Sequence, residues 1–256
     1  AAPLGERSTR LLRQPTVSAT QVAFEYGGDI WVVSRSGGEA RRLTATPAIE
    51  TDPHFSPDGR WVAFTSNRTG MPEVWIVAAD GGEPHRLTWY PSPSYARGWT
   101  PDGKEVLYAS DRGSAPVPYA HLWLVPTDGG PPNEVPEAMA FRGSFSPDGA
   151  RLVVDRVDRW DVEFRNYRGG QNTPLTILDR KTLDETPLPN DERTTDTWPV
   201  WLGGKVFFLS DRDYTTNVWS YDVATKLLAQ VTHVTDADVK TLGGGATDAL
   251  AFEEDG

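Results

Sequence analysis

Three copies of one turn decide the fold: Ser56-Pro57-Asp58-Gly59, Thr100-Pro101-Asp102-Gly103 and Ser146-Pro147-Asp148-Gly149. Their aspartates lie roughly 44 to 46 residues apart, so the chain contains an internal repeat of nearly constant period. The aspartate of such a turn accepts backbone N–H groups and the glycine takes the left-handed conformation. Because a residue that recurs in every repeat indicates architecture, we expect these aspartates to be structural; calcium binding is the alternative, but no loop has its ligand spacing.

Each turn is followed by short apolar segments in a fixed order. The first segment ends in an arginine, the second carries a tryptophan, a Gly-Gly turn follows in three copies, and a short Arg-Leu-Thr segment closes the unit. The arginine copies are Ser66-Asn67-Arg68, Ser110-Asp111-Arg112, Asp155-Arg156 and Ser210-Asp211-Arg212. The tryptophans are Trp31, Trp75, Trp123 and Trp219, which we expect to pack between neighbouring units. Four short strands in a period of about 44 residues are typical of a propeller blade, and no window has a helical apolar period.

Six segments precede a turn of this kind or match such a segment, and we expect them to be the innermost strands around a central channel. The sequence therefore predicts an all-β, six-bladed β-propeller. The segments are Gln14–Ser18, Pro53–Ser56, Arg97–Thr100, Phe141–Ser146, Trp198–Trp201 and Val239–Gly243. Residues 1–8 are a lead-in, and the propeller domain covers 9–256, with blades at about 9–44, 53–88, 97–136, 141–190, 198–232 and 239–256.

The last of these blades is predicted to be incomplete. Ala251-Phe252-Glu253 matches Ala23-Phe24-Glu25, after which the first unit has two further strands. Thr9-Arg10-Leu11-Leu12 resembles a closing strand and is able to supply one of the two, but not both. Since bare sheet edges are avoided in natural proteins, we expect the chain to be the N-terminal part of a longer protein.

Antiparallel strands place successive turns on alternate faces of the disc, so the arginine loops share one face and the Pro-Asp-Gly and Gly-Gly turns the other. Two interpretations remain open for Arg68, Arg112, Arg156 and Arg212. They either tie blades together through carboxylates or carbonyls, or form a ring that binds anionic groups of a peptide.

The fourth unit carries an insertion at residues 157–170, in which aromatic and charged side chains alternate irregularly. Repeat proteins place insertions on faces where partners bind, so Arg165, Tyr167 and Arg168 are candidate contacts for a peptide or another domain. An ordinary long hairpin with solvated charges is the alternative.

Composition excludes several functions. The formal net charge of −11 argues against binding nucleic acid, which needs clustered Lys and Arg. The chain has no cysteine and no apolar run long enough to span a membrane as a helix. It lacks the motifs of serine hydrolases, zinc peptidases and nucleotide-binding loops, and His54, His85, His121 and His233 have no metal-ligand spacing. We therefore expect no catalytic residue, metal or cofactor in this chain.

The series Ser-Pro-Asp-Gly, Ser-Asn/Asp-Arg, Val-Trp-Ile-Val, Gly-Gly and Arg-Leu-Thr resembles the TolB-like propeller repeat rather than the WD repeat. Segments 158–174, 192–196 and 208–213 look like the N-terminal propeller of tricorn-type serine proteases. This second resemblance implies a parent with a second propeller, a PDZ domain and a Ser-nucleophile protease core, assembled as an oligomer. It implies for this chain a role in gating or delivering peptide substrates.

A TolB-like periplasmic scaffold that binds envelope proteins is the competing hypothesis, and a sugar- or metabolite-binding propeller is a third. TolB-like proteins carry an α/β domain before the propeller, whereas only about a dozen residues precede the first blade here. The Ala1-Ala2-Pro3 start resembles a signal-peptide cleavage product, so we expect a periplasmic or secreted protein, with the cytoplasm as the alternative.

Overall fold

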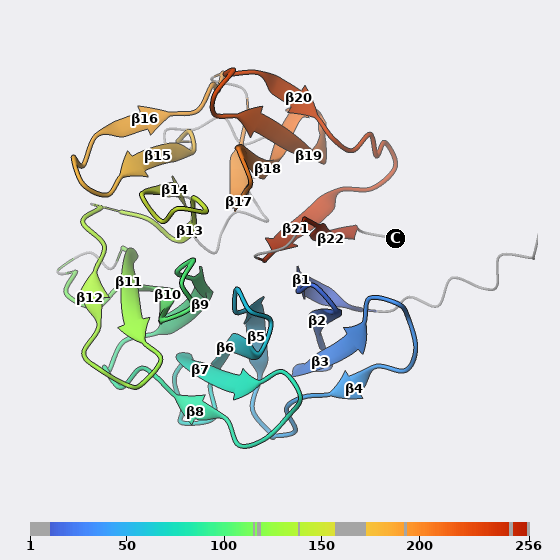
Figure 1. The fold of residues 1–256 in the computed structure, drawn as a ribbon, viewed down its shortest axis with the longest axis vertical. Helices are drawn as coiled ribbons and strands as arrows, with labels where there is room; N and C mark the ends of the chain where they lie inside the picture. The colour runs from blue at the N-terminus through green and yellow to red at the C-terminus, as the bar shows by residue number, and fades with distance from the viewer. Residues whose placement is uncertain are drawn as a thin grey trace, which may run out of the picture.

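The computed structural model describes residues 11–114, 116, 119–137, 139–156, 173–191, 194–245 and 248–254. Its sheets follow one another around a central axis, so that the chain runs once around a ring (Figure 1). Every described element of regular structure is a strand, and within each sheet every strand pairs antiparallel with the next one in sequence. The all-β propeller predicted from the repeat is therefore confirmed.

Five sheets have four strands. Blade 1 comprises β1 (Arg13–Val17), β2 (Gln21–Tyr26), β3 (Asp29–Ser34) and β4 (Arg41–Arg42). Blade 2 comprises β5 (Glu50–Phe55), β6 (Trp61–Ser66), β7 (Glu73–Ala78) and β8 (His85–Arg86). Blade 3 comprises β9 (Ser94–Trp99), β10 (Glu105–Ser110), β11 (His121–Pro126) and β12 (Asn133–Glu134). Blade 4 comprises β13 (Arg142–Phe145), β14 (Arg151–Asp155), β15 (Thr176–Asp179) and β16 (Glu185–Pro187). Blade 5 comprises β17 (Asp196–Leu202), β18 (Lys205–Asp213), β19 (Thr215–Asp222) and β20 (Leu228–Gln230).

The sixth sheet has only two strands, β21 (Val239–Gly244) and β22 (Leu250–Glu254). The count of six blades is thus corrected to five four-stranded blades and one two-stranded sheet, because the sixth repeat supplies only an inner strand and its neighbour among the described residues. Leu11 and Leu12 pair with no strand, and residues 9 and 10 of the expected closing strand lie outside the described residues.

The two-stranded sheet lies between blades 5 and 1, since β21 contacts both β17 and β1 (Figure 1). Glycine allows this approach. A Cβ added to Gly243 would lie 1.8 Å from the carbonyl oxygen of Pro15 in β1, and one added to Gly244 would lie 2.5 Å from Val200 in β17. The ring closes here because Gly243 and Gly245 let the chain pack directly on the backbone of β1, and Gly244 leaves room for the Val200 side chain of β17.

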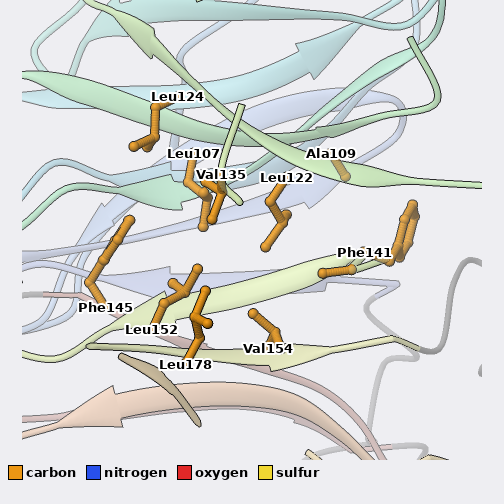
Figure 2. Packing of buried hydrophobic residues seen from close by; sticks show 11 residues of the cluster. Leu107, Ala109, Leu122, Leu124, Val135, Phe141, Phe145, Leu152, Val154 and Leu178 are labelled. Atoms are coloured by element: carbon orange, nitrogen blue, oxygen red, sulfur yellow. The ribbon is translucent and has the colours of Figure 1, made fainter. Parts of the chain in front are cut away.

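The hydrophobic core is divided among the spaces between adjacent blades. Between blades 3 and 4, Leu107 and Leu122 pack against Leu152 and Leu178, all of them inaccessible to solvent or nearly so (Figure 2). Equivalent clusters lie between the other consecutive pairs. The repeated Trp75, Trp123 and Trp219 pack at the edges of these clusters, as predicted. Trp31 belongs to none of them and instead contacts Tyr26 of its own blade. Each blade is therefore held by its neighbours rather than by a core of its own.

The repeated turn has the expected geometry. Ser56 donates a hydrogen bond of 2.6 Å to the Asp58 carboxylate, which also accepts the Arg60 N–H at 3.0 Å. These two bonds lower the pKa of Asp58 to about 2. Gly59 has a φ of 70°, in the left-handed region. The aspartate is fully engaged in closing the turn, as its recurrence indicated.

Candidate functional site

Three of the four repeated arginines form ion pairs with carboxylates. Arg68 pairs with Glu50, and Arg212 contacts both oxygens of Asp196 at 2.8 and 3.0 Å. Glu50 and Asp196 are wholly buried. Burial raises the pKa of Asp196 even though the Arg212 guanidinium opposes that rise. Arg156 bridges Glu137 at 2.7 Å and Glu185 at 2.8 Å. These three arginines therefore have structural partners within the propeller.

The fourth arginine, Arg112, has a different environment. Its guanidinium lies 4.3 Å from the ring centre of Tyr90 and 4.4 Å from that of Trp123. Burial raises the pKa of the Tyr108 hydroxyl, and the nearby Arg112 guanidinium opposes that rise. No carboxylate among the described residues lies within ion-pair distance of Arg112. The structure thus separates Arg112 from the other three members of the predicted ring.

The three predicted contact residues of the insertion are Arg165, Tyr167 and Arg168. They lie outside the described residues, together with the rest of 157–172. Their contact with a peptide or domain stays a prediction.

A network of polar side chains crosses the channel at one level. Gln14 of β1 accepts the Asp52 N–H at 2.7 Å, and the Asp52 carboxylate pairs with Arg97 of β9 at 2.6 Å. The Arg97 side chain continues to blade 4 by donating to the carbonyl oxygen of Phe141 at 2.9 Å. Gln14 is also linked to the sixth sheet, because its backbone N–H donates to the Glu253 carboxylate of β22 at 3.2 Å. We call Gln14, Asp52, Arg97, Arg142 and Trp198 the channel belt.

The other half of the channel belt links blades 4 and 5. Arg142 of β13 lies 3.5 Å from the Asp155 carboxylate and stacks 4.2 Å from the ring centre of Trp198 in β17. The backbone N–H of Trp198 in turn donates to the Asp155 carboxylate at 3.3 Å. Asp52, Arg97 and Arg142 are each more than nine-tenths buried although they belong to innermost strands. These inner-strand side chains are therefore shielded from solvent at this level of the channel.

Buried electrostatics keep the channel belt in one protonation state. Burial raises the pKa of Asp52, but Arg97, His54 and the hydrogen bond from Thr51 together outweigh burial and hold that pKa below its ordinary value. Burial lowers the pKa of the neighbouring His54 to about 4, so that His54 is neutral at pH 7. The Asp52–Arg97 ion pair of the belt thus lies beside a neutral imidazole.

Local backbone strain accompanies the channel belt. Gln14, Asp52 and Trp198 have φ values of 48°, 53° and 54°, and each precedes a proline. This conformation is unfavourable for residues other than glycine, and their strands change register at the same points. The resulting bulges lie beside the side chains that meet in the channel.

A cavity of about 440 Å³ adjoins the channel belt on the side of the Pro-Asp-Gly turns. Its wall includes Trp99, Phe145 and Trp201, and the turn prolines Pro57, Pro101 and Pro147. Arg97, Arg142 and His54 also line it. The channel is therefore a pocket that the belt separates from the arginine-loop face.

Sequence reasoning located the innermost strands but missed the channel belt. Two signals for it were present in the sequence. Charged residues occur in the otherwise apolar inner strands, at Asp52, Arg97 and Arg142, and three of the inner strands share a proline, which directly follows Gln14, Asp52 and Trp198. Pairing between blades that are far apart in sequence was not deducible from the repeat.

The described residues contain no cluster of three or more potential metal ligands. Among the same residues, no helix is long and apolar enough to cross a membrane.

A ring of antiparallel sheets joined by these turns, with paired arginines on the opposite face, defines a β-propeller of the TolB-like class. Residues 9–256 match the family described as "Tricorn protease N-terminal beta propeller domain", and the chain belongs to that family. It is 34% identical over 210 residues to "Tricorn protease homolog 1" of Streptomyces coelicolor, covering 82% of this chain and 20% of the relative. The chain thus spans about a fifth of the length of that relative.

Solved structures support the fold. "Crystal structure of the tricorn protease" superposes with a TM-score of 0.82 at 21% identity, covering 96% of this chain and 24% of the other. "The structure of putative TolB from Agrobacterium tumefaciens" gives a TM-score of 0.71 at 19% identity, with 87% and 81% coverage. A TolB-like repeat is also evident in sequence, since "Tol-Pal system protein TolB" of Bordetella pertussis is 51% identical over 45 residues, which are 17% of this chain and 10% of that protein.

Proposed function

We propose that this propeller is a non-catalytic domain of a tricorn-type serine peptidase and that it gates or delivers peptide substrates to a protease core elsewhere in the parent protein. Family membership supports the peptidase parent, and the relatives are named as tricorn proteases. Together with the second propeller and PDZ domain that the resemblance implies, such a core would be the principal partner of residues 9–256. Oligomerisation would occur through the parent protein.

The channel belt is the observation that carries the gating role. Peptide passage through the propeller requires the belt to open, and the Asp52–Arg97 ion pair is its central contact. The cavity next to the belt has room for a few residues of an extended chain, with aromatic and proline side chains for contact. A closed channel with a vestibule on one side has the arrangement of a gate.

Hydrolysis by the parent protein tests this role. Asp52→Asn removes the charge of the pair, and we expect it to increase kcat/KM for peptides of about 15 residues at least threefold, which corresponds to roughly 0.7 kcal/mol. Hydrolysis of a dipeptide fluorogenic substrate is expected to stay unchanged. Equal effects on both substrates, or none on the long peptide, would show that the channel is not the route. Arg60→Gln on the turn face is the matched control.

The insertion is the proposed contact for a peptide or neighbouring domain. An Arg165→Ala/Arg168→Ala double variant of this chain is expected to bind an acidic test peptide at least threefold more weakly than the wild type. Unchanged affinity would assign the insertion to a solvated hairpin. The isolated chain itself is expected to hydrolyse no peptide.

A TolB-like protein-binding scaffold is the second candidate, favoured by the 51% identity over 45 residues to "Tol-Pal system protein TolB". This function predicts stable complexes with other proteins in cells that express the parent protein, with no effect of Asp52→Asn on peptide hydrolysis. Under either function we propose an exported protein, and cell fractionation with a cytoplasmic marker distinguishes that location from the cytoplasm.

A further inference from the structure

Blade 3 lacks a carboxylate that equivalent positions in blades 2 and 5 possess. In blade 2, Glu50 opens the innermost strand, pairs in register with Ser66 and binds Arg68. In blade 5, Asp196 is opposite Ser210 and binds Arg212 in the same way. In blade 3 the position opposite Ser110 is occupied by Ser94, and the arginine is Arg112. A guanidinium that is neutralised twice elsewhere in the ring is not neutralised here.

The surroundings of Arg112 are adapted to the missing carboxylate without replacing its charge. Tyr108 stands where blades 2 and 5 have Phe64 and Phe208, so the Arg112 guanidinium has a hydroxyl near it in place of a third apolar ring. A hydroxyl leaves the positive charge uncompensated. Tyr90 and Trp123 fix the guanidinium plane between their rings. The cation is therefore held in place, and it is only partly buried.

A second difference in blade 3 occurs one residue earlier. Asn67 and Asp211, which precede the arginines of blades 2 and 5, accept the N–H groups of Ile49 and Thr195. The corresponding residue in blade 3 is Pro93, which has no N–H, and the buried Oδ1 of Asp111 has no partner among the described residues. The loop before Ser94 is thus not tied to the blade as its counterparts are.

Blade 3 also lacks an acidic residue at the start of its third strand. Asp29 and Glu73 open β3 and β7 and pair with Arg42 and Arg86, whereas β11 opens with His121, which contacts Glu134 at 2.9 Å. Blade 3 consequently has Ser94 and His121 where blade 2 has the carboxylates of Glu50 and Glu73.

Exposed aromatic side chains lie close in the chain to the residues that hold the guanidinium. Tyr90, whose ring centre is 4.3 Å from it, is 44% exposed, and the adjacent Trp89 is 70% exposed and stacks on Arg86. Tyr119 is 42% exposed and packs 5.0 Å from the His121 ring. Arg112 thus has an exposed aromatic ring against its cation, and both residue types are enriched at protein–protein contacts.

We propose that Arg112 and the exposed rings of Trp89, Tyr90 and Tyr119 form a docking site for the side-chain carboxylate of an Asp or Glu, flanked by an apolar residue, on a partner protein. The incoming carboxylate takes the place that Glu50 and Asp196 occupy in blades 2 and 5. A side-chain carboxylate is the group we assign here, because the side chains of Glu50 and Asp196 are what binds the equivalent arginines in blades 2 and 5. The site is independent of the gate proposed for the channel.

Nuclear magnetic resonance titration of this chain tests the proposal, with signals from the Arg112 side-chain N–H and the Trp89 indole. The probe is the peptide acetyl-Gly-Leu-Glu-Phe-Gly-amide, and the comparison peptides replace Glu by Gln or carry the only carboxylate at a free C-terminus. We expect the Glu peptide to shift both signals and to bind at least fivefold more tightly than either comparison peptide. Equal affinity for the Glu and Gln peptides, or tighter binding of the free C-terminus, would overturn the proposal.

Two variants provide independent controls. Ser94→Glu restores the carboxylate of blade 2 beside Arg112, and we expect it to abolish Glu-peptide binding without lowering the melting temperature. Arg112→Gln removes the cation and is expected to have the same effect on binding, whereas Arg60→Gln on the opposite face leaves binding unchanged. Undiminished binding by folded Arg112→Gln protein would refute the assignment even if Ser94→Glu failed to fold.

Discussion

Removing the Asp52 carboxylate is expected to destabilise the whole propeller, because the channel belt joins blades that are distant in sequence. The Asp52 and Arg97 side chains are 9% and 6% exposed, and their N–O distance is 2.6 Å. In Asp52→Ala the Arg97 charge stays buried without that partner, which costs about 3–5 kcal/mol. Relief of the left-handed backbone does not offset this loss, since alanine is equally strained at a φ of 53°.

A second variant at the same position separates charge from strain. Asp52→Gly also removes the carboxylate but accepts the left-handed conformation without penalty, so it is expected to be about 1 kcal/mol more stable than Asp52→Ala. Arg97→Met/Asp52→Ala removes both charges and fills much of the same volume. The double variant is therefore expected to recover about 2 kcal/mol relative to Asp52→Ala.

Urea unfolding followed by tryptophan fluorescence measures these differences, provided that the slope with denaturant is unchanged. A loss below about 1 kcal/mol in Asp52→Ala would refute the argument that this ion pair is desolvated. It would also show that the channel belt contributes little to stability. Failure of the double variant to recover stability would show that the loss comes from packing and not from an unpaired charge.

Three further predictions concern closure, pH and packing. Gly243→Ala drives a Cβ into the Pro15 carbonyl, so it is expected to cost more than about 3 kcal/mol, whereas Gly204→Ala, with open space around it, costs less than about 1; equal melting temperatures would contradict this. His54 has a folded pKa of about 4, below its unfolded value near 6.5. Its contribution to the free energy of unfolding is therefore fully present above pH 6.5 and is lost as the pH falls towards 4. We expect roughly 2 kcal/mol of this acid destabilisation to disappear in His54→Gln, measured by urea unfolding at pH 7 and 4.5; an unchanged difference would exclude His54 as its source. Leu152→Ala, wholly buried between blades 3 and 4, is expected to lower the unfolding free energy by about 2–5 kcal/mol, against little change for the exposed Leu227→Ala.

The sequence predicts the parts of this fold that the repeat itself encodes. The Pro-Asp-Gly turn, the tryptophan strand and the order of strands depend on neighbours within one unit, so the period was enough to locate them. The sixth sheet shows the limit of that logic. Ala251-Phe252-Glu253 identified β22, but the close approach of β21 to Pro15 and Val200 depends on which blades meet at ring closure.

The candidate sites were less predictable because they lie where repeats differ. Arg68, Arg112, Arg156 and Arg212 look equivalent in sequence, and their partners decide their roles. Glu50 and Asp196 lie at one position of the unit, yet Arg156 takes Glu137 and Glu185 from other positions, so no fixed spacing identifies the partner. The register of β9 with β10 was needed to show that Ser94 occupies the place of an acidic residue.

The two faces of the disc therefore differ in what variation can change. On the turn face, the aspartates are engaged by the backbone of their own turn, so substitutions there alter stability first. On the arginine face, Arg68 and Arg212 pair with carboxylates and also stack on Trp75 and Trp219, so one substitution of the carboxylate opens the pair while the tryptophan still holds the guanidinium. Blade 3 has that arrangement, with Ser94 in the place of the carboxylate and Arg112 between Tyr90 and Trp123. Under the docking site proposed above, a repeat fold makes a recognition element from a structural ion pair by omitting one partner, because the aromatic rings continue to hold the other in position.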